Sequence, residues 1–408
     1  MEENVINNQE LLKRMRRVSV AEEPAPNKQE LLKRLSEEFK HYSDLKNYSV
    51  YSVKQYLARG VFTKEELINV FPDKKEIIKR LSNDPNYYPA HIAKLFMEIN
   101  LITSNDLLDV FPENVSESVA DYTEPTIERK FTDIPGKIKE DCKEIYFWGL
   151  SSSGKTCALA GILNTINRKG YYIPNPNIVS GDYLSGLMNI FDRKTNISFL
   201  PNITTNQTIR YMNFKFQGNK AVAFIDLSGE VIKQIHHYHF YKANSADSDT
   251  IAKIKNLLNN NNRKIHFFII DYHRHTQDPN PILNELAAIF EQEKYFKRTT
   301  DNIYILISKA DMFECEPNQR TDFARFFFDK KYGSFKNHLE MICRKNEINI
   351  NKKTGEVDMD DFVLDFSIGN VYLQKICDFN SKSSEKIIDI LSSKIKAERT
   401  GKWSSIFN

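Results

Sequence analysis

The 408-residue sequence lacks the features that define several large classes of protein. Its five cysteines are scattered and form no C-x-x-C pair, which argues against a zinc site or a disulfide framework and favours a reducing compartment. No window approaches the run of about 18 apolar residues that predicts a transmembrane helix, and the N-terminus has no apolar segment of the signal-peptide kind. We therefore expect a cytoplasmic protein.

The sequence also lacks a strong excess of either charge. The formal net charge of +3 is too close to neutral to favour nucleic acid or a membrane surface as a partner. Aromatic residues, by contrast, are abundant: 27 Phe and 19 Tyr are enough to build a large core. At about 100–200 residues per domain, the length predicts two or three domains. Composition places a poorly ordered segment at 1–27, a helical domain at 28–115, a polar connector at 116–140 and an α/β domain at 141–408.

Two phrases recur in the N-terminal part of the chain. A phrase of the form E-[LI]-[LI]-K-R begins at Glu10, Glu30 and Glu76. A longer stretch, 60–72, matches 100–112, and each copy has the Thr-to-acidic spacing of a capping box at a helix start. Self-similarity at about 40 residues predicts short stacked helical repeats. Such repeats commonly bind a protein partner, and the alternative is a helical subdomain that only packs on the second domain.

The stretch 145–159, IYFWGLSSSGKTCAL, contains a complete phosphate-binding motif, G-x-x-x-x-G-K-[ST]. An apolar run before the motif predicts a buried strand, and an Ala- and Leu-rich run after it predicts a helix. The glycines let the loop N–H groups converge on phosphate oxygens, and the helix N-terminus adds positive potential. Lys155 is expected to reach the β- and γ-phosphates, and the Thr156 hydroxyl to ligate Mg²⁺. A chance Gly- and Ser-rich turn is the alternative.

Strands and helices alternate through the rest of this domain. Apolar runs at 209–216 and 221–225 predict an antiparallel hairpin, and buried strands are expected at 265–270, 303–307 and 362–366. The alternation predicts an α/β fold with a mainly parallel sheet covered by helices, preceded by a small all-α repeat domain. Ligands of such sheets bind at the carboxyl ends of the strands.

Three short motifs follow predicted strands: Asp226-Leu-Ser-Gly229, Ser308-Lys-Ala-Asp311 and Ser367-Ile-Gly369. With the phosphate loop, and in this order, they resemble the motif set of P-loop GTPases of the Ras-like and translation-factor class, over residues 145–397. The long insertions and the N-terminal repeats favour a bacterial member. The resemblance implies GTP or GDP and Mg²⁺ as ligands, and loops around 199–208 and 226–243 that change with the nucleotide.

The resemblance also implies a role for each motif. Asp226 would hold Mg²⁺ through water, the Gly229 N–H would contact the γ-phosphate, and Asp311 would accept two hydrogen bonds that guanine offers and adenine does not. The first mobile loop would supply a Mg²⁺ ligand, Thr205, with Thr204 and Thr208 as alternatives. The residues expected to contact the nucleotide are Gly149, Ser151, Ser152, Ser153, Gly154, Lys155, Thr156, Cys157, Gly229, Ser308, Lys309, Asp311, Ser367 and Ile368. The expected metal ligands are Thr156, Thr205, Thr208 and Asp226, and the residues expected to act in hydrolysis are Lys155, Thr205 and Glu230.

Three positions depart from the family pattern. Glu230 stands where Ras-like enzymes have a glutamine that positions water, and a carboxylate cannot donate a hydrogen bond to the γ-phosphate. Ser151 stands where Ras has glycine, so that it would crowd an inserted arginine. Ser308 replaces the usual Asn or Thr of the base-reading motif. We therefore expect slow GTP hydrolysis, helped by a partner.

Two groups of histidines suggest a metal site: His236, His237 and His239, and then His273 and His275. We favour the interpretation that they are solvated side chains on a helix and a loop, because no metal-binding motif surrounds them.

The sequence alone leaves three functions open. The first is a GTP-binding regulatory switch with hydrolase activity, read by a protein partner through the helical repeats. The second is a P-loop ATPase or a small-molecule kinase, which Ser308 keeps open. The third is a scaffold that binds nucleotide without hydrolysing it, which Glu230 and Ser151 suggest.

Overall fold

The computed structural model describes most of the chain, in two compact units, Met1–Asp121 and Tyr122–Asn408. The described residues are 27–40, 53, 56–123, 125, 134–135, 138–175, 180–191, 197–201, 208–218, 220–241, 245–275, 281–297, 299–351 and 354–396. Among them, no helix combines the length and the apolar composition that crossing a membrane requires.

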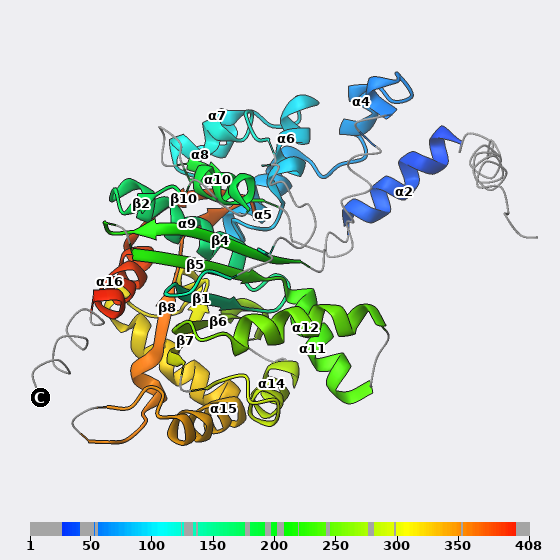
Figure 1. The fold of residues 1–408 in the computed structure, drawn as a ribbon. Helices are drawn as coiled ribbons and strands as arrows, with labels where there is room; N and C mark the ends of the chain where they lie inside the picture. The colour runs from blue at the N-terminus through cyan, green and yellow to red at the C-terminus, as the bar shows by residue number, and fades with distance from the viewer. Residues whose placement is uncertain are drawn as a thin grey trace, which may run out of the picture. The chain divides into compact units, whose positions relative to one another are not determined.

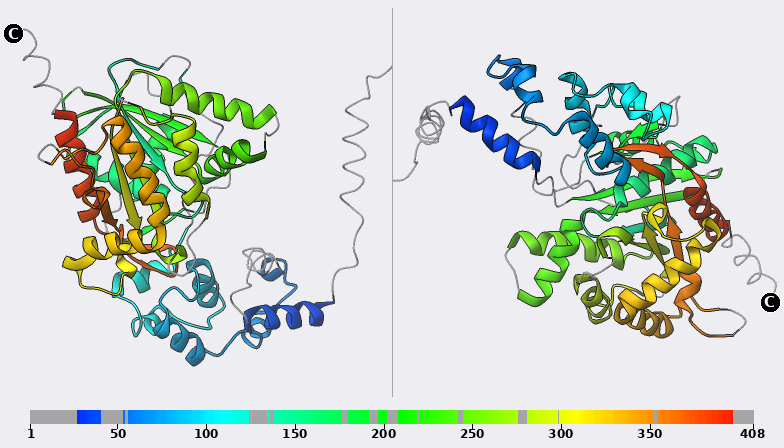
Figure 2. Two further views of the ribbon diagram at one scale, coloured as in Figure 1. Left: turned by 90° about the horizontal axis from the view of Figure 1, so that it is seen from below. Right: turned by 180° about the vertical axis from the view of Figure 1, so that it is seen from behind.

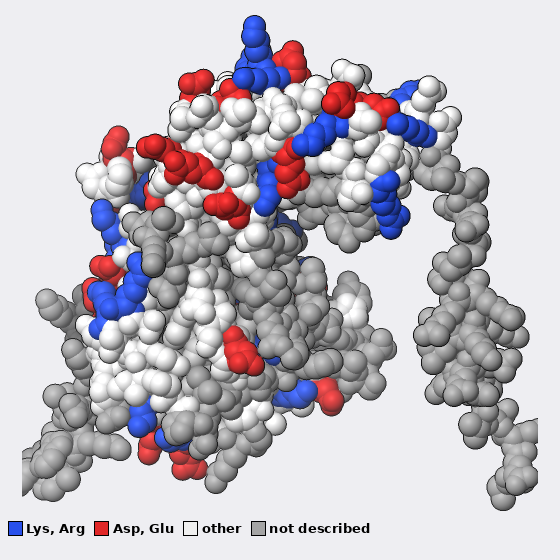
Figure 3. Space-filling model, turned by 90° about the horizontal axis from the view of Figure 1, so that it is seen from above, with Lys and Arg blue, Asp and Glu red and all other residues white. Residues whose placement is uncertain are grey.

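The first unit consists of short helices in its described part. They are α2 (Lys28–Lys40), α4 (Lys64–Ile68), α5 (Lys74–Asn83), α6 (Ala90–Glu98), α7 (Ser104–Leu107) and α8 (Glu113–Ser118). Acidic and basic side chains are interspersed over the face shown in Figure 3. Some of them pair within the unit, as Lys74 does with Asp106 at 2.6 Å between Nζ and Oδ1.

The two matching stretches of this unit have the same local structure. Thr63 caps α4 in a full capping box with Glu66, and Thr103 caps α7 in the same way with Asp106. The leucine that follows each acidic residue is fully buried. The sequence similarity therefore corresponds to a similar helix start with a similar buried contact, while the use of these helices as an interaction surface stays a prediction.

The second unit is built on a seven-stranded sheet. Its strands are β1 (Lys143–Trp148), β2 (Tyr172–Ile173), β4 (Ile209–Phe216), β5 (Lys220–Leu227), β6 (Lys264–Asp271), β7 (Thr300–Ser308) and β8 (Val363–Phe366). From edge to edge the order is β2-β4-β5-β1-β6-β7-β8 (Figure 1). The pairs β5–β1, β1–β6, β6–β7 and β7–β8 are parallel, whereas β4 is antiparallel to both β5 and β2. The predicted hairpin is therefore present.

Helices cover both faces of this sheet. One face packs against α9 (Lys155–Arg168), α10 (Gly181–Asn189) and α16 (Lys382–Lys396), and the other against α11 (Gly229–Tyr241), α12 (Ser245–Asn259), α14 (Pro281–Gln292) and α15 (Arg320–Asn346) (Figures 1 and 2). Each interface buries its own apolar core, because strands covered on both faces carry apolar side chains on both. The predicted α/β fold class, a mainly parallel sheet covered by helices, is thus confirmed.

A second, smaller sheet was not predicted from the sequence. Its strands β3 (Ile197–Phe199), β9 (Gly369–Tyr372) and β10 (Ile376–Phe379) pair antiparallel in the order β3-β10-β9. Gly369 has a φ of +111°, and a Cβ at this position would lie 2.0 Å from the Asp378 carbonyl oxygen. Only glycine fits this close approach of two strands.

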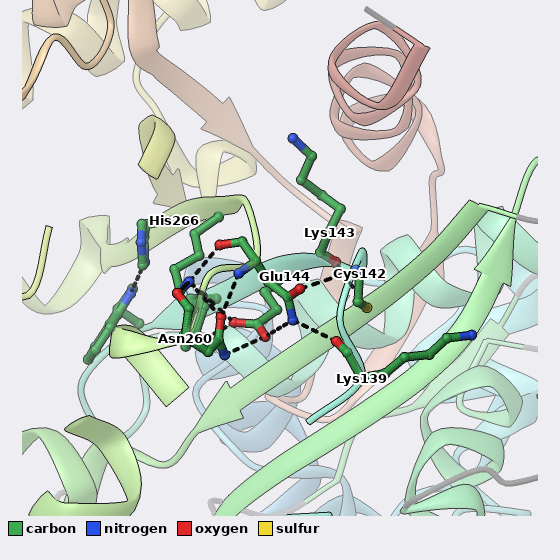
Figure 4. Close-up of polar contacts among 10 residues, drawn as sticks. Lys139, Cys142, Lys143, Glu144, Asn260 and His266 are labelled. Carbon is green, nitrogen blue, oxygen red and sulfur yellow. Dashed lines mark hydrogen bonds and ion pairs between the residues drawn. The ribbon is translucent and has the colours of Figure 1, made fainter. Parts of the chain in front are cut away.

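The amino ends of the central strands enclose a buried polar cluster (Figure 4). The Glu144 carboxylate accepts hydrogen bonds from the Tyr146 hydroxyl at 2.7 Å and from the Asn260 and Asn262 side-chain amides at 2.8 Å each. Lys264 Nζ lies 3.9 Å from Glu144 Oε2, and both side chains have no exposed surface. Asn260 and Asn262, from the Asn-rich run at 256–262, therefore supply hydrogen-bond partners to a buried ion pair.

Lys264 is the cation of this cluster. Its ammonium donates to the Asn260 carbonyl at 2.9 Å, to Asn260 Oδ1 at 2.8 Å and to the Asn262 carbonyl at 2.6 Å. Burial lowers the pKa of Lys264 to about 8, against the opposing effect of the Glu144 carboxylate. The charged form is thus held by one carboxylate and three neutral oxygens, far from water.

Candidate nucleotide-binding site

The phosphate loop lies between β1 and α9, as predicted. Gly154 has a φ of +80° and caps α9, and Ser152 also has a positive φ, of +69°. The Ser153 N–H donates to the Leu150 carbonyl at 3.1 Å, which closes the turn. A Cβ on Gly149 would lie 2.5 Å from Ser153 Oγ, so the first glycine of the motif permits the loop to fold back on its own strand end. The first N–H groups of α9 have no partner within the helix and form a site for anions.

Lys155 and Asp226 meet at the centre of the site. The register of β1 and β5 places Phe147 opposite Asp226, so the D-x-x-G motif starts beside the phosphate loop. Lys155 Nζ lies 3.3 Å from Asp226 Oδ1, and both side chains are less than a tenth exposed. The Tyr183 hydroxyl on α10 donates to Asp226 Oδ2 at 2.7 Å, and the Arg210 guanidinium lies 5.4 Å from the centre of the Tyr183 ring.

The surroundings of Asp226 show whether a metal ion would fit at this site. Oδ1 is buried and accepts no hydrogen bond from the described residues, although it faces the Lys155 ammonium. A buried carboxylate oxygen with this unused capacity suits Mg²⁺, which takes oxygen ligands and keeps several waters. Asp226 therefore fits a metal, while the role of Thr156, in the first turn of α9, stays a prediction.

The Gly229 end of the D-x-x-G motif packs directly on the phosphate loop. A Cβ on Gly229 would lie 2.0 Å from the Ser151 amide nitrogen and 2.6 Å from the Leu150 carbonyl carbon. The next residue, Glu230, accepts a hydrogen bond from the Ser151 hydroxyl at 2.8 Å and pairs with Lys233 Nζ at 2.9 Å. The Lys233 ammonium, and then the Ser151 hydroxyl, lower the pKa of the Glu230 carboxyl below its usual value. Ser151 and Glu230, two of the three positions that depart from the family pattern, are thus hydrogen-bonded to each other.

Ser308, the third departure, links two loops. Its hydroxyl donates to the Ser153 carbonyl at 2.7 Å and lies 3.1 Å from the Ile270 carbonyl. Gly154 passes close by, so that a Cβ added there would be in ordinary contact with Ser308 Oγ, at 3.5 Å. The S-K-x-D loop is therefore fixed to the phosphate loop through a single hydroxyl.

The base-reading candidates lie together at the ends of β7 and β8. Asp311, in the 3₁₀ turn η2 (Ala310–Met312), accepts a hydrogen bond from the Ser367 hydroxyl at 2.7 Å. Burial raises the pKa of the Asp311 carboxyl, which the Ser367 hydrogen bond partly opposes. Lys309 has a φ of +61°, and its Nζ pairs with Asp271 Oδ2 at 2.8 Å. Ile368 follows Ser367 in the chain, and its carbonyl accepts a hydrogen bond from the Asn380 N–H at 2.8 Å.

The remaining predicted residues are placed less completely. Thr204 and Thr205 lie outside the described residues. Thr208 is buried, and its N–H donates to the Ser228 hydroxyl at 3.1 Å, which ties it to the D-x-x-G motif. Cys157 is in the first turn of α9, where burial raises the pKa of its thiol to about 11, so its backbone N–H is the group available to a phosphate.

The histidines show no metal site in the described part of the chain. His236 on α11 contacts the Glu285 carboxylate of α14, and His239 Nδ1 lies 4.0 Å from Glu293 Oε1. His273 is exposed, and the side chain of His275 lies outside the described residues. His236 thus contacts α14 and His239 lies near Glu293, just after that helix, whereas the sequence had suggested solvated side chains.

Three residues of the site were missed by sequence reasoning: Tyr183, Asp271 and Arg274. Tyr183 belongs to no motif. Asp271 and Arg274 fall in the stretch DYHRH, where attention to histidine hid the other side chains. The signal that could have found them is position, because Asp271 is the last residue of β6, at the edge where the other motifs lie.

Comparison with known proteins gives fold likeness only. No protein-family model matches the chain, and no curated protein matches its sequence. Among solved structures, a Plasmodium falciparum protein described as nucleolar GTP-binding protein 1 is similar over 66% of this chain and 93% of its own, at 13% identity and a TM-score of 0.29. A bacterial selenocysteine-specific elongation factor, EF-Sec, is similar over 62% of this chain and 28% of its own, at 9% identity and a TM-score of 0.27.

The GTPase-like domain of Saccharomyces cerevisiae Ski7, solved with GTP bound, is similar over 56% of this chain and 42% of its own, at 13% identity and a TM-score of 0.28. Identities and TM-scores this low leave the nature of the ligand to the geometry of the site. That geometry is an α/β sheet whose strand ends bring the phosphate loop, the buried Asp226 carboxylate and the Asp311 carboxylate to one edge.

Proposed function

We propose that the protein binds GTP and GDP with Mg²⁺, hydrolyses GTP slowly, and acts as a nucleotide-dependent switch for a protein partner. One observation carries the proposal. The Ser308 hydroxyl connects two subsites, the phosphate loop, which contains Lys155, and the loop that contains Asp311. A nucleotide with a phosphate chain and a hydrogen-bonding base matches this pair of subsites.

The residues divide the work as follows. Lys155 and the first N–H groups of α9 bind the phosphate oxygens, and Thr156 and Asp226 would hold Mg²⁺, which neutralises charge on the phosphates. The Tyr183 hydroxyl holds one oxygen of Asp226 and leaves the other facing Lys155, so that the carboxylate keeps a fixed orientation. The Asp311 side-chain oxygens accept from guanine, and Ser367 orients them.

Slow hydrolysis follows from the state of Glu230. Its carboxylate is bonded to Ser151 and Lys233, and its pKa is lowered, so it is ionised at neutral pH. An ionised carboxylate accepts hydrogen bonds only, and it repels a phosphate. This same observation favours the second candidate, a protein that keeps its nucleotide without hydrolysing it; retained tight binding with no phosphate release, even with a partner present, would support it.

The phosphate loop is in direct contact with the start of α11, so a change at the nucleotide could move this helix. Because Gly229 lies against Leu150 and Ser151, any change at the terminal phosphate meets the first turn of α11 without an intermediate element. We assign the reading of this change to a protein partner that contacts the helices α4 to α8 or the nucleotide-sensitive loops. The recurrent capping boxes support this assignment, since repeated helical units commonly serve as binding scaffolds.

The first test is calorimetric titration of the purified chain with GTP, GDP and ATP in the presence of Mg²⁺. We expect guanine nucleotides to bind, and Lys155→Ala to weaken GTP binding by about 100-fold or more, because truncating one partner of a buried charge pair costs about 2–5 kcal/mol. Normal GTP binding by this variant would contradict the proposal. Preference for ATP would instead favour an ATPase or a small-molecule kinase.

The second test concerns Asp311, the residue that we expect to recognise the base. In Asp311→Asn, the side-chain amide can donate to a carbonyl at C2 of a purine but no longer accepts from both N1–H and the 2-amino group of guanine. We expect GTP binding to weaken by about 100-fold and xanthosine triphosphate, which has that carbonyl, to become the preferred ligand. Competition titration measures both. An unchanged preference for GTP would show that Asp311 does not read the base.

A further inference from the structure

A single arginine lies on the phosphate loop from an element that the motif set does not include. Arg274 belongs to α13 (Tyr272–His275), the short turn after β6. Its Nη1 donates to the Ser151 carbonyl at 3.0 Å. Among the described residues, this carbonyl is the one acceptor that the guanidinium contacts, so its other N–H groups stay available.

The turn that presents Arg274 is held on both sides. The Arg274 N–H donates to Asp271 Oδ1 at 3.3 Å, and the other oxygen of the same buried carboxylate pairs with Lys309. Tyr272 packs edge-on against Phe313 and Phe327, with ring centres 4.7 Å and 5.1 Å apart. The backbone of Arg274 is therefore positioned by the sheet and by an aromatic cluster, while its side chain extends over the loop.

The contact point lies at the terminal-phosphate end of the loop. Ser151 is the residue on which Gly229 packs, and its hydroxyl is bonded to Glu230. In the proposed function, this is the end of the loop where the γ-phosphate is transferred. The same end lacks a side-chain donor from Glu230, whose carboxylate is ionised and already paired with Lys233.

We propose that Arg274 is the arginine that stabilises the transferring phosphoryl group, supplied from within the chain; this inference rests on the proposed GTP hydrolysis. A water oxygen forms a bond to the γ-phosphorus as the bond to the β,γ-bridging oxygen breaks. The electron pair of that bond stays on GDP, and both water protons end on the product, dihydrogen phosphate. Negative charge grows on the transferring oxygens and the bridging oxygen, and a permanently charged, planar guanidinium suits both.

The test separates binding of the ground state from binding of a transition-state analogue. GDP with aluminium fluoride and Mg²⁺ is titrated into the wild type, Arg274→Ala, Arg274→Lys and a control, Arg344→Ala. Arg344 is an exposed arginine near the end of α15, whose partner there is Glu340. Single-turnover GTP hydrolysis is measured on the same four proteins.

We expect Arg274→Ala to bind GDP within about threefold of the wild type, but to bind GDP with aluminium fluoride and to hydrolyse GTP about 100-fold less well. Arg274→Lys should fall between, because it keeps the charge and loses the planar fork. Arg344→Ala should match the wild type in all three measurements.

Three outcomes would overturn the inference. Equal losses for GDP and for its aluminium fluoride complex in Arg274→Ala would mean that the guanidinium only holds the Ser151 carbonyl. A wild type that binds GDP no better with aluminium fluoride would mean that the chain itself supplies no such stabilisation. A wild type that binds no guanine nucleotide would overturn the proposed function, and this inference with it.

Discussion

Replacing Gly229 with alanine should lower the free energy of unfolding by about 3 kcal/mol, the upper part of the range for overpacked sites. The added methyl would lie 2.0 Å from the Ser151 nitrogen and 2.6 Å from the Leu150 carbonyl carbon, and both are backbone atoms that no rotamer change can move. The start of α11 must therefore separate from the phosphate loop. A separation of this kind would also displace the proposed contact of the Gly229 N–H with the γ-phosphate, and misplacement by about 1 Å can cost 100-fold in rate.

Urea unfolding and single-turnover GTP hydrolysis measure the two effects of Gly229→Ala. The matched control is Gly333→Ala in α15, where an added Cβ meets nothing within 4 Å. Because alanine favours a helix interior over glycine by about 1 kcal/mol, this control should be neutral or slightly stabilising. Equal stability of the two variants would contradict the close packing of Gly229 on the loop.

Glu144→Ala should be the most destabilising single change at the other end of the sheet, by about 3–5 kcal/mol. It leaves the Lys264 charge buried without a counter-ion and removes the acceptor of the Tyr146, Asn260 and Asn262 side chains. Urea unfolding at pH 7 checks this value. An exposed pair, Arg344 with Glu340 on α15, serves as the control and should contribute about 0.3–0.5 kcal/mol.

Lys264→Met removes the cation of the Glu144–Lys264 pair, and its effect on the free energy of unfolding should depend on pH. The pKa of Lys264 is about 8 in the folded chain, below its ordinary value of 10.5, so the unfolded chain binds more protons between these two values. The contribution of Lys264 to stability therefore rises as the pH increases from 8 to 10.5. The stability of the wild type relative to Lys264→Met should rise in this interval, and a flat difference would show that Lys264 is not buried as a cation.

What the sequence could predict is the position of each motif along one edge of the sheet. The phosphate loop, Asp226, Ser308 and Ser367 each lie at or just after the carboxyl end of a strand with a clear apolar run, and parallel strands bring these ends together. The strand β3 and its partners have three or four residues each, too short for a periodic pattern. The small sheet therefore escaped prediction.

The contacts between side chains from distant elements could not be predicted in the same way. Tyr183 precedes Asp226 by 43 residues, and their hydrogen bond depends on how α10 packs on α9. Arg274 reaches Ser151 across 123 residues because Asp271 fixes the turn that carries it. Such pairs are set by tertiary packing, which no local pattern encodes. The bacterial origin and the protein partner stay predictions.

The Ser308 hydroxyl has a consequence for how affinity is distributed over a ligand. Because it fastens the base-side loop to the phosphate loop, the two subsites have a fixed separation before any ligand arrives. A molecule that occupies both loses its freedom of translation once, and its second contact forms at a high effective concentration. Guanosine and a free triphosphate together should therefore bind far more weakly than the intact nucleotide. This chelate effect would shrink if Ser308 became alanine, because the hydrogen bond that fastens the two loops would be lost.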